Sequence, residues 1–184
     1  MKMRKLIMLS IAFAILGAAS VRADGRSALL ERRVKAAFLY KFGGYVEWQP
    51  WAFPTPDAPF TIGVVGDDAL AREMAIVVAD RMIGTRRVLV TALAERDSVQ
   101  VLQMLFVARS ASPQLSQLMR DIRQRPVLVV TEWEGALNEG SMINFVLRNA
   151  RVRFEISLSQ AERHGLALSS RLLGVARSVV TGPP

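Results

Sequence analysis

Large apolar side chains recur at helical spacing near the start of the chain. Val34, Phe38 and Phe42 stand at i, i+4 and i+8, so they share one face of a helix. We expect this helix over residues 27–48, because Ser27 can cap its start and the proline-rich segment that follows cannot continue it.

Further along, apolar runs alternate with amphipathic segments. The runs cover residues 60–65, 87–93, 101–107 and 127–131. Nearly continuous apolar runs are typical of strands whose two faces are both covered. Helical patterns at 69–80 and 113–124, and a short polar helical piece around 94–100, lie between the runs. This alternation predicts a largely parallel sheet between helical layers.

The last part of the chain has a different pattern. Two runs, at 142–147 and 152–157, are joined by a short turn and predict an antiparallel hairpin. Helices are expected over 158–164 and 171–179. The predicted fold class is therefore α/β: a single three-layer domain, with a largely parallel sheet flanked by helices and an antiparallel hairpin at one edge.

The first residues have the pattern of a signal peptide. Lys2, Arg4 and Lys5 precede an apolar run, and small residues follow up to Ala23. The run is shorter than the roughly 20 residues that span a bilayer, which makes a retained membrane anchor the less favoured alternative. We therefore expect residues 1–23 to be a signal peptide that is cleaved on export.

Cleavage is expected to leave one exported domain, residues 24–184. The leader carries four positive charges and no acid, so the formal net charge falls from +8 to +4 when it is removed. The remaining arginines are scattered and no nucleic-acid-binding motif is present, so we expect no nucleic acid as partner. The chain has no cysteine and a single histidine, which excludes disulfides and most zinc, iron–sulfur and thiol chemistry. We predict no metal and no cofactor.

Gly66, Asp67 and Asp68 follow the first predicted strand at its carboxyl end. Ligands bind at such ends in open α/β sheets, and adjacent acids there can hold a cation. The favoured interpretation is capping of the next helix by one of the two aspartates. A small-molecule site in a cleft beside Gly66 and Asp67 remains the alternative.

No set of residues predicts catalysis. His164 stands before a glycine at a predicted helix end, where a histidine typically caps the last carbonyls. Glu132, Glu134 and Glu139 share a loop, and nothing in their spacing singles out an acid pair, so we expect a solvated loop. We predict that the protein is not an enzyme.

Two groups of side chains leave a protein-contact surface open, although burial of the tryptophans and a solvated charged face are the favoured interpretations. Trp133 is the expected exposed aromatic, whereas Trp48 and Trp51 are expected to pack against the sheet. The strand from residue 152 alternates, with an apolar face and a charged face that carries Arg153 and Glu155. The predicted partner-binding residues are Trp133, Arg153, Glu155, Leu166 and Leu168.

Seven short blocks of sequence along the mature domain are informative through their order and spacing. They are residues 36–42 (AAFLYKF), 46–48 (VEW), 60–68 (FTIGVVGDD), 105–107 (LFV), 140–146 (GSMINFV), 153–156 (RFEI) and 165–173 (GLALSSRLL). With this order and spacing, the chain resembles the YfiR-like family of bacterial periplasmic proteins. Relatives often carry a cysteine where this chain has Leu102, so disulfide-based redox control is not implied here.

The resemblance implies a regulator. YfiR-like proteins bind the periplasmic sensor domain of an inner-membrane diguanylate cyclase and hold it inactive. An outer-membrane lipoprotein can sequester the repressor, which releases cyclic di-GMP synthesis and biofilm formation. We therefore expect a periplasmic repressor of a diguanylate cyclase or a similar membrane sensor. A homodimer, a small-molecule binding module and an enzyme of unrecognised type remain open alternatives.

Overall fold

The structure is a computed structural model that describes residues 25–94, 101–123 and 125–182. The predicted signal peptide and the helical piece expected around 94–100 lie outside these residues, except for Ala94. Within the described residues, no helix combines the length and the apolar character that a membrane span requires.

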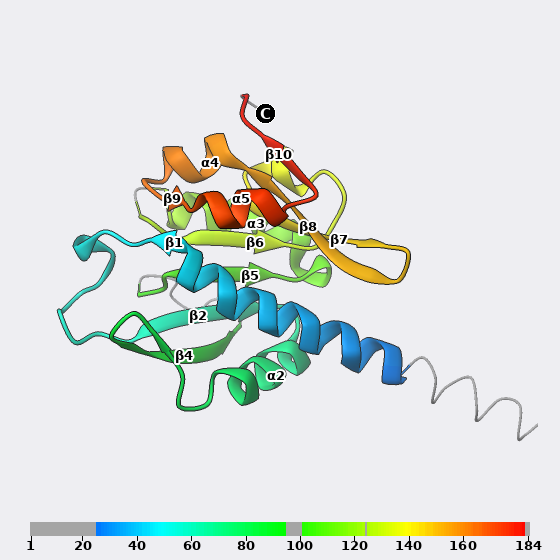
Figure 1. Ribbon diagram of the computed structural model, residues 1–184, viewed down its shortest axis with the longest axis horizontal. Coiled ribbons are helices and arrows are strands. Elements are labelled where there is room, and N and C mark those ends of the chain that lie inside the picture. The colour runs from blue at the N-terminus through cyan, green and yellow to red at the C-terminus, as the bar shows by residue number, and fades with distance from the viewer. Residues whose placement is uncertain (1–24, 95–100, 124, 183–184) are drawn as a thin grey trace, which may run out of the picture.

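One large sheet forms the centre of the molecule (Figure 1). Its strands run in the spatial order β10, β8, β7, β6, β5, β2, β4, β3. Their bounds are β2 (Phe60–Val65), β3 (Met82–Ile83), β4 (Arg86–Leu93), β5 (Met104–Val107), β6 (Leu128–Thr131), β7 (Ile143–Arg148), β8 (Arg151–Ser157) and β10 (Ser178–Val180). Strands β4, β2, β5, β6 and β7 are parallel to their neighbours in turn. The predicted α/β fold with a largely parallel sheet is confirmed.

Strands β7 and β8 form the predicted antiparallel hairpin. Asn149 and Ala150 make its two-residue turn with φ of 51° and 55°. The hairpin is not the outermost part of the sheet, because β10 pairs with β8 in parallel beyond it. At the other end, β3 pairs with β4 in an antiparallel manner. Both short edge strands were missed, since two or three residues give no readable alternation.

Helices cover both faces of the sheet. The N-terminal helix is described over residues 25–45, and the others are α2 (Asp68–Val78), α3 (Leu115–Asp121), α4 (Leu158–Arg163) and α5 (Ser170–Val175). Short 3-10 helices are η1 (Pro50–Ala52), η2 (Arg109–Gln114) and η3 (Ala136–Glu139). A second, two-stranded sheet pairs β1 (Val46–Glu47) with β9 (Ala167–Leu168).

The N-terminal helix crosses one face of the sheet, in front of it in Figure 1. Phe42 is 1% exposed and stacks on Phe145 of β7 and against Phe154 of β8, with ring centroids 5.7 and 4.9 Å away. The predicted apolar row is only partly correct, because Val34 is 41% exposed. Ser27 lies inside the helix and does not cap its start, contrary to expectation.

The connections after β2 and β5 run to opposite faces. The chain moves one way across the sheet from β2 to β4 and the other way from β5 to β6. Right-handed crossovers therefore place α2 and α3 on opposite faces. Arg33 of the N-terminal helix pairs with Glu73 of α2 at 3.2 Å, which puts these two helices side by side. The result is the predicted three-layer arrangement.

Several helix boundaries differ from prediction, including the end of the N-terminal helix, which was expected at residue 48 but lies at residue 45, directly before β1. Pro113 was expected to begin an α-helix, but it lies inside η2 and the α-helix starts at Leu115. The last helix ends at Val175, and the chain then extends into β10 instead of continuing as a helix to residue 179. Arg177 makes this strand possible, because its backbone N–H donates to Phe154 O at 2.8 Å.

Candidate functional site: a cleft at the carboxyl edge of the sheet

A cleft of about 760 Å³ lies where the parallel strands end. One wall is the start of the N-terminal helix, and the other is the β7–β8 hairpin (Figure 1). The residues that follow β2, β5 and β6 lie between these walls. Its lining includes Glu31, Arg32, Lys35, Asp67, Arg109, Glu132, Trp133, Asn144, Arg148 and Glu155. The volume is within the range of small-molecule sites, and the position is the one where open α/β sheets bind ligands.

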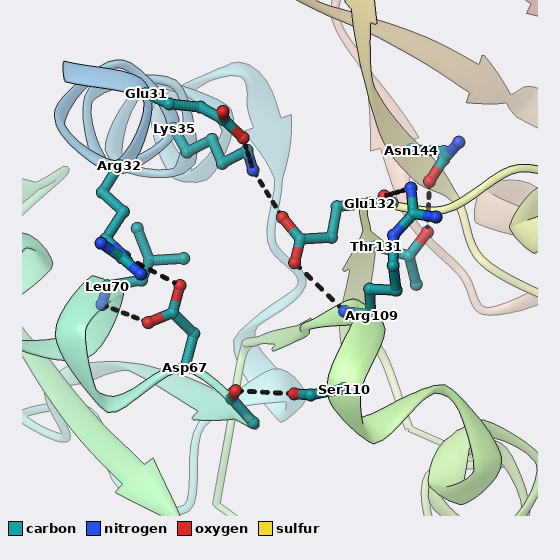
Figure 2. A network of polar contacts seen from close by, with 11 residues as sticks. Glu31, Arg32, Lys35, Asp67, Leu70, Arg109, Ser110, Thr131, Glu132 and Asn144 are labelled. Carbon is teal, nitrogen blue, oxygen red and sulfur yellow. Dashed lines mark hydrogen bonds and ion pairs between the residues drawn. The ribbon is translucent and has the colours of Figure 1, made fainter. Parts of the chain in front are cut away.

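Lys35 joins the N-terminal helix to the end of β6 (Figure 2). Its Nζ donates to Glu132 Oε2 at 2.5 Å and also to Glu31 one helical turn away. Glu132 Oε1 accepts from the backbone N–H of Arg109 at 3.1 Å. The side chain of Glu132 is only 16% exposed, so the expectation of a fully solvated loop is wrong for this residue.

Burial alone would lower the pKa of Lys35, because it disfavours the charged amine. Hydrogen bonds and Coulomb attraction from Glu132 and Glu31 outweigh this, so the pKa lies above the ordinary lysine value of 10.5. Lys35 is therefore a fixed positive charge whose neighbours already neutralise it. We regard it as a structural link between the helix and the sheet, not as a proton donor.

Asp67 has the capping role that the sequence favoured. Its Oδ1 accepts from the backbone N–H of Leu70 at 3.0 Å, in the first turn of α2. Its Oδ2 accepts from Arg32 Nε at 3.2 Å (Figure 2). Both carboxylate oxygens are thus occupied. Among the described residues, no group of three or more histidine or acidic side chains could hold a metal ion.

The crevice directly beside Gly66 is closed. Ser110 Oγ donates to Gly66 O at 2.7 Å, which ties the loop after β5 to the loop after β2 (Figure 2). Gly66 has φ of 82°, and a Cβ added there would lie 2.6 Å from Ser110 Oγ. The position between the ends of β2 and β5, where the two connections leave in opposite directions, therefore has no room for a ligand. The open space is displaced toward β6 and β7, with Asp67 at its border.

Buried polar groups lie under this open space. Thr131 is fully buried, and its Oγ1 donates to Asn144 Oδ1 at 2.9 Å. The same hydroxyl lies 2.8 Å from Ser141 Oγ. Asn144 is 2% exposed and is among the residues that line the cleft. In the described part of the chain, no buried side-chain nitrogen or oxygen lacks a hydrogen-bond partner.

The predicted partner-binding residues are scattered. Trp133 was expected to be exposed, but it is 7% exposed and its Nε1 donates to Glu139 Oε1 at 3.2 Å. Leu166 is 2% exposed and belongs to the core. Leu168 is half-buried in β9, where it pairs with Val46. These three residues offer little free surface to a partner.

Arg153 and Glu155 lie on one face of β8, as predicted. Val152, Phe154 and Ile156 fill the opposite, buried face. Arg153 is exposed, whereas Glu155 is paired with Arg177 next to β10.

Several features of the site were missed from the sequence. Trp51 is 61% exposed on η1, although packing against the sheet was expected; Trp48 does pack, 5.0 Å from Phe60. Lys35 and Asn144 gave no signal, because their partners stand far away in sequence. His164 Nδ1 lies 3.0 Å from Gln160 O at the end of α4, in agreement with its predicted role at a helix end.

Comparison with known proteins identifies one family. Residues 32–177 match the model of a family described as YfiR/HmsC-like. A comparison with curated proteins gives no match. The matched range includes the whole sheet up to β8 and most of the cleft lining.

Proposed function

Because the chain belongs to the YfiR/HmsC-like family, we propose that it is a periplasmic regulator that binds and represses the sensor domain of an inner-membrane diguanylate cyclase or a similar signalling protein. The family match over residues 32–177 is the observation that carries this proposal. An outer-membrane lipoprotein is the second proposed partner, and it relieves repression by sequestering the regulator.

The tip of the β7–β8 hairpin, residues 147–153, is the surface that best fits a docking role. Arg148, Arg151 and Arg153 are exposed and have no hydrogen-bond or ion-pair partner among the described residues. The pairing of Arg148 with Arg151, and of Val146 with Arg153, puts all three arginines on one face. Leu147 pairs with Val152 on the opposite face of the hairpin and is 55% exposed. An acidic partner surface would match the arginine face of this tip.

Repression by contact needs only a modest energy difference. A regulator shifts its target toward the inactive state by binding that state more tightly than the active one. A tenfold bias needs about 1.4 kcal/mol of differential binding. Loss of one arginine–carboxylate pair at the interface is enough to remove such a bias.

The test is co-expression with a membrane diguanylate cyclase from the same genome. Wild-type protein should lower cellular cyclic di-GMP, and Arg153→Glu should restore it while leaving the thermal midpoint of the purified protein unchanged. Arg72→Glu is the matched control, because Arg72 is an exposed arginine on α2, far from the hairpin in the sheet order. Failure of the wild-type protein to change cyclic di-GMP with any such cyclase would refute the repressor function.

A periplasmic small-molecule binding module is the second candidate function. The cleft at the carboxyl edge of the sheet favours it, although the space does not lie directly beside Gly66. A ligand that binds the folded protein raises its thermal midpoint without any partner protein. A ligand screen by thermal shift therefore distinguishes this function from one that depends on protein contact alone.

A further inference from the structure

Strand β4 is the last long strand at one end of the sheet (Figure 1). In the described part of the chain only β3 lies beyond it, and β3 pairs with Arg86 and Arg87 at the start of β4. Residues 88–93 therefore pair with β2 on one side, and no strand of the described residues pairs with them on the other. Such an edge presents backbone N–H and C=O groups that have no strand partner.

The pattern of hydrogen bonds shows which groups point away from β2. The N–H of Val88 donates to Arg81 O at 3.2 Å, and Arg81 directly precedes β3 on the outer side. The side alternates along a strand, so Val90 and Ala92 also point outward. Ala92 O already accepts from Thr91 Oγ1 at 3.4 Å. Among the described residues, the open outward groups are Val88 O, the N–H and C=O of Val90, and Ala92 N–H.

This edge lacks the features that usually keep sheet edges apart. Residues 88–93 (VLVTAL) contain no charged side chain, no proline and no glycine. Leu89 is 50% exposed on this strand. The opposite end of the sheet differs, because β10 has only three residues and Pro183 and Pro184 follow it closely in sequence. An exposed apolar edge strand such as β4 pairs readily with a further strand.

A second copy of β4 matches the open groups. Let two β4 strands run antiparallel, related by a two-fold axis at Val90. The two Val90 residues then exchange their N–H and C=O hydrogen bonds. Val88 lies opposite Ala92 of the other copy, and each Ala92 N–H donates to the opposite Val88 O. This register satisfies every open group on both strands.

The same register also suits the side chains. Leu89 lies opposite Thr91 of the other copy, so the exposed leucine gains a cross-strand neighbour. Arg87 lies opposite Leu93, which separates the two Arg87 residues by about 20 Å along the strands. This separation exceeds the Debye length of about 8 Å at physiological ionic strength, so the like charges do not oppose pairing. A parallel arrangement would instead place the two arginines side by side.

We propose that the protein forms a symmetric homodimer in which two β4 strands pair antiparallel about Val90 and join two sheets into one. Two-fold symmetry closes the assembly, because each β4 edge covers the other. Strands β2, β5 and β6 separate β4 from the β7–β8 hairpin in the strand order, so the proposed docking tip is not used. The inference rests on the sheet edge and is independent of the repressor function.

The first test measures the mass of the purified exported protein, residues 24–184, by sedimentation equilibrium. The mass should rise with concentration from that of one chain toward that of two chains and should not rise further. A mass of one chain at every concentration up to about 1 mM would overturn the proposal and leave the edge to a strand from another protein.

A proline at the edge tests the backbone pairing. Ala92→Pro removes an outward N–H and keeps the bonds to β2, because Ala92 does not face β2. It should raise the dissociation constant of the dimer at least about tenfold, since each copy loses one hydrogen bond. The thermal midpoint of the dilute protein should stay the same. An unchanged dissociation constant in the folded variant would contradict pairing through β4.

Two exposed leucines give a matched pair for the side chains. Leu89 is 50% exposed on β4, and Leu147 is 55% exposed on the hairpin. Leu89→Lys places two ammonium groups on diagonal positions, roughly 7–8 Å apart, and should weaken the dimer at least about fivefold. Leu147→Lys adds the same charge elsewhere and should change the dissociation constant less than about twofold. Equal weakening by both variants would refute the β4 interface.

Single cysteines test the register, because the natural chain has none. Val90→Cys should link two copies by a disulfide under mild oxidation, since directly paired residues of this kind have Cα atoms about 5.5 Å apart. Ala92→Cys should not link them, because the two Ala92 positions are about 13 Å apart along the strands. Dimeric protein in which Val90→Cys stays unlinked, or in which both variants link equally, would rule out this register.

Discussion

Lys35 links two layers of the fold through a single ammonium group. Its side chain is 12% exposed, and that of Glu132 is 16% exposed. A charge pair this far from water loses more when one partner is removed than an exposed pair does, because the remaining charge stays desolvated. The interaction therefore contributes to stability as long as the amine is protonated.

The first prediction concerns pH. The pKa of Lys35 is raised in the folded protein, so its contribution is complete below the unfolded value of 10.5 and is lost as pH rises through the folded value. Lys35→Met should lower the free energy of unfolding by about 1.5–3 kcal/mol at neutral pH. Urea unfolding should show this difference shrinking above pH 10.5. A constant difference across that range would mean that the variant acts through packing alone.

Ala150 stands in a backbone conformation that suits glycine. Its φ of 55° follows the φ of 51° at Asn149, which is the pattern of a type I′ turn. Ala150→Gly should therefore raise the free energy of unfolding by about 1 kcal/mol, measured by chemical denaturation. Asn149→Gly should change it less, since asparagine tolerates this region. Destabilisation by Ala150→Gly would show that the alanine methyl group makes a contact that outweighs the strain.

Single residues were predictable where their chemistry acts locally. Asp67 follows a strand and precedes a helix, and local sequence is enough to predict a cap. The exposure of Trp133 was predicted wrongly, because the loop folds so that Trp133 is buried and its Nε1 donates to Glu139 Oε1. Local sequence does not show how such a loop folds, even when the partner is close in sequence.

At the scale of elements, two adjacent glycines in the N-terminal helix have different surroundings. A Cβ at Gly43 would lie 2.5 Å from Ile83 Cδ1 and 3.2 Å from Phe60 Cζ, whereas a Cβ at Gly44 would meet nothing within 4 Å. Gly44→Ala should stabilise the protein by about 0.5–1 kcal/mol through helix propensity. Gly43→Ala should be at least about 1 kcal/mol less stable than Gly44→Ala, because crowding opposes the same gain. Equal thermal midpoints would refute the close approach of helix and sheet.

The C-terminal strand β10 depends partly on a side-chain pair. Arg177 and Glu155 hold β10 against β8, with side chains 44% and 21% exposed. Glu155→Lys should lower stability by about 0.5–1 kcal/mol, and the charge swap with Arg177→Glu should recover most of it. The swap also isolates any role of Glu155 in partner binding. Recovery of stability without recovery of repression would assign Glu155 to the interface, and recovery of both would remove it.

Long elements were predictable and short ones were not. The central strands are buried on both faces, so each one appears in the sequence as a continuous apolar run. The missed strands β1, β3, β9 and β10 have two or three residues each and exist because a longer neighbour offers backbone partners. Their positions follow from tertiary contacts, which propensity does not include.

At the scale of the whole molecule, the N-terminal helix and the sheet share one aromatic core. Phe42 is 1% exposed between β7 and β8, so Phe42→Ala should cost about 3–5 kcal/mol. Val34→Ala, on the same helix but 41% exposed, should change stability by less than about 0.5 kcal/mol. Circular dichroism and tryptophan fluorescence should give the same midpoint for each protein. Separate midpoints would show that the helix unfolds independently.

The order of apolar runs and helical patterns was enough to predict the fold class. The position of the cleft could be predicted only in part. The carboxyl end of the first strand correctly pointed to the edge where the cleft lies. Its position along that edge depends on Ser110, which closes the space beside Gly66. Its lining includes Arg109 of η2 and Asn144 of β7, which are far apart in sequence and lie at one cleft only after the sheet has formed.

The protruding hairpin has a consequence for the history of this protein. Strands β5 and β6 are buried along their whole length, so almost any change there disturbs packing. The side chains of residues 147–151 are exposed, and only the backbone of this segment is held by pairing between β7 and β8. Substitutions there leave the interior untouched. Mutations should therefore accumulate at the tip much faster than in the centre. Orthologues that have changed their binding partner would differ in sequence first at these few positions, and they would keep the same fold.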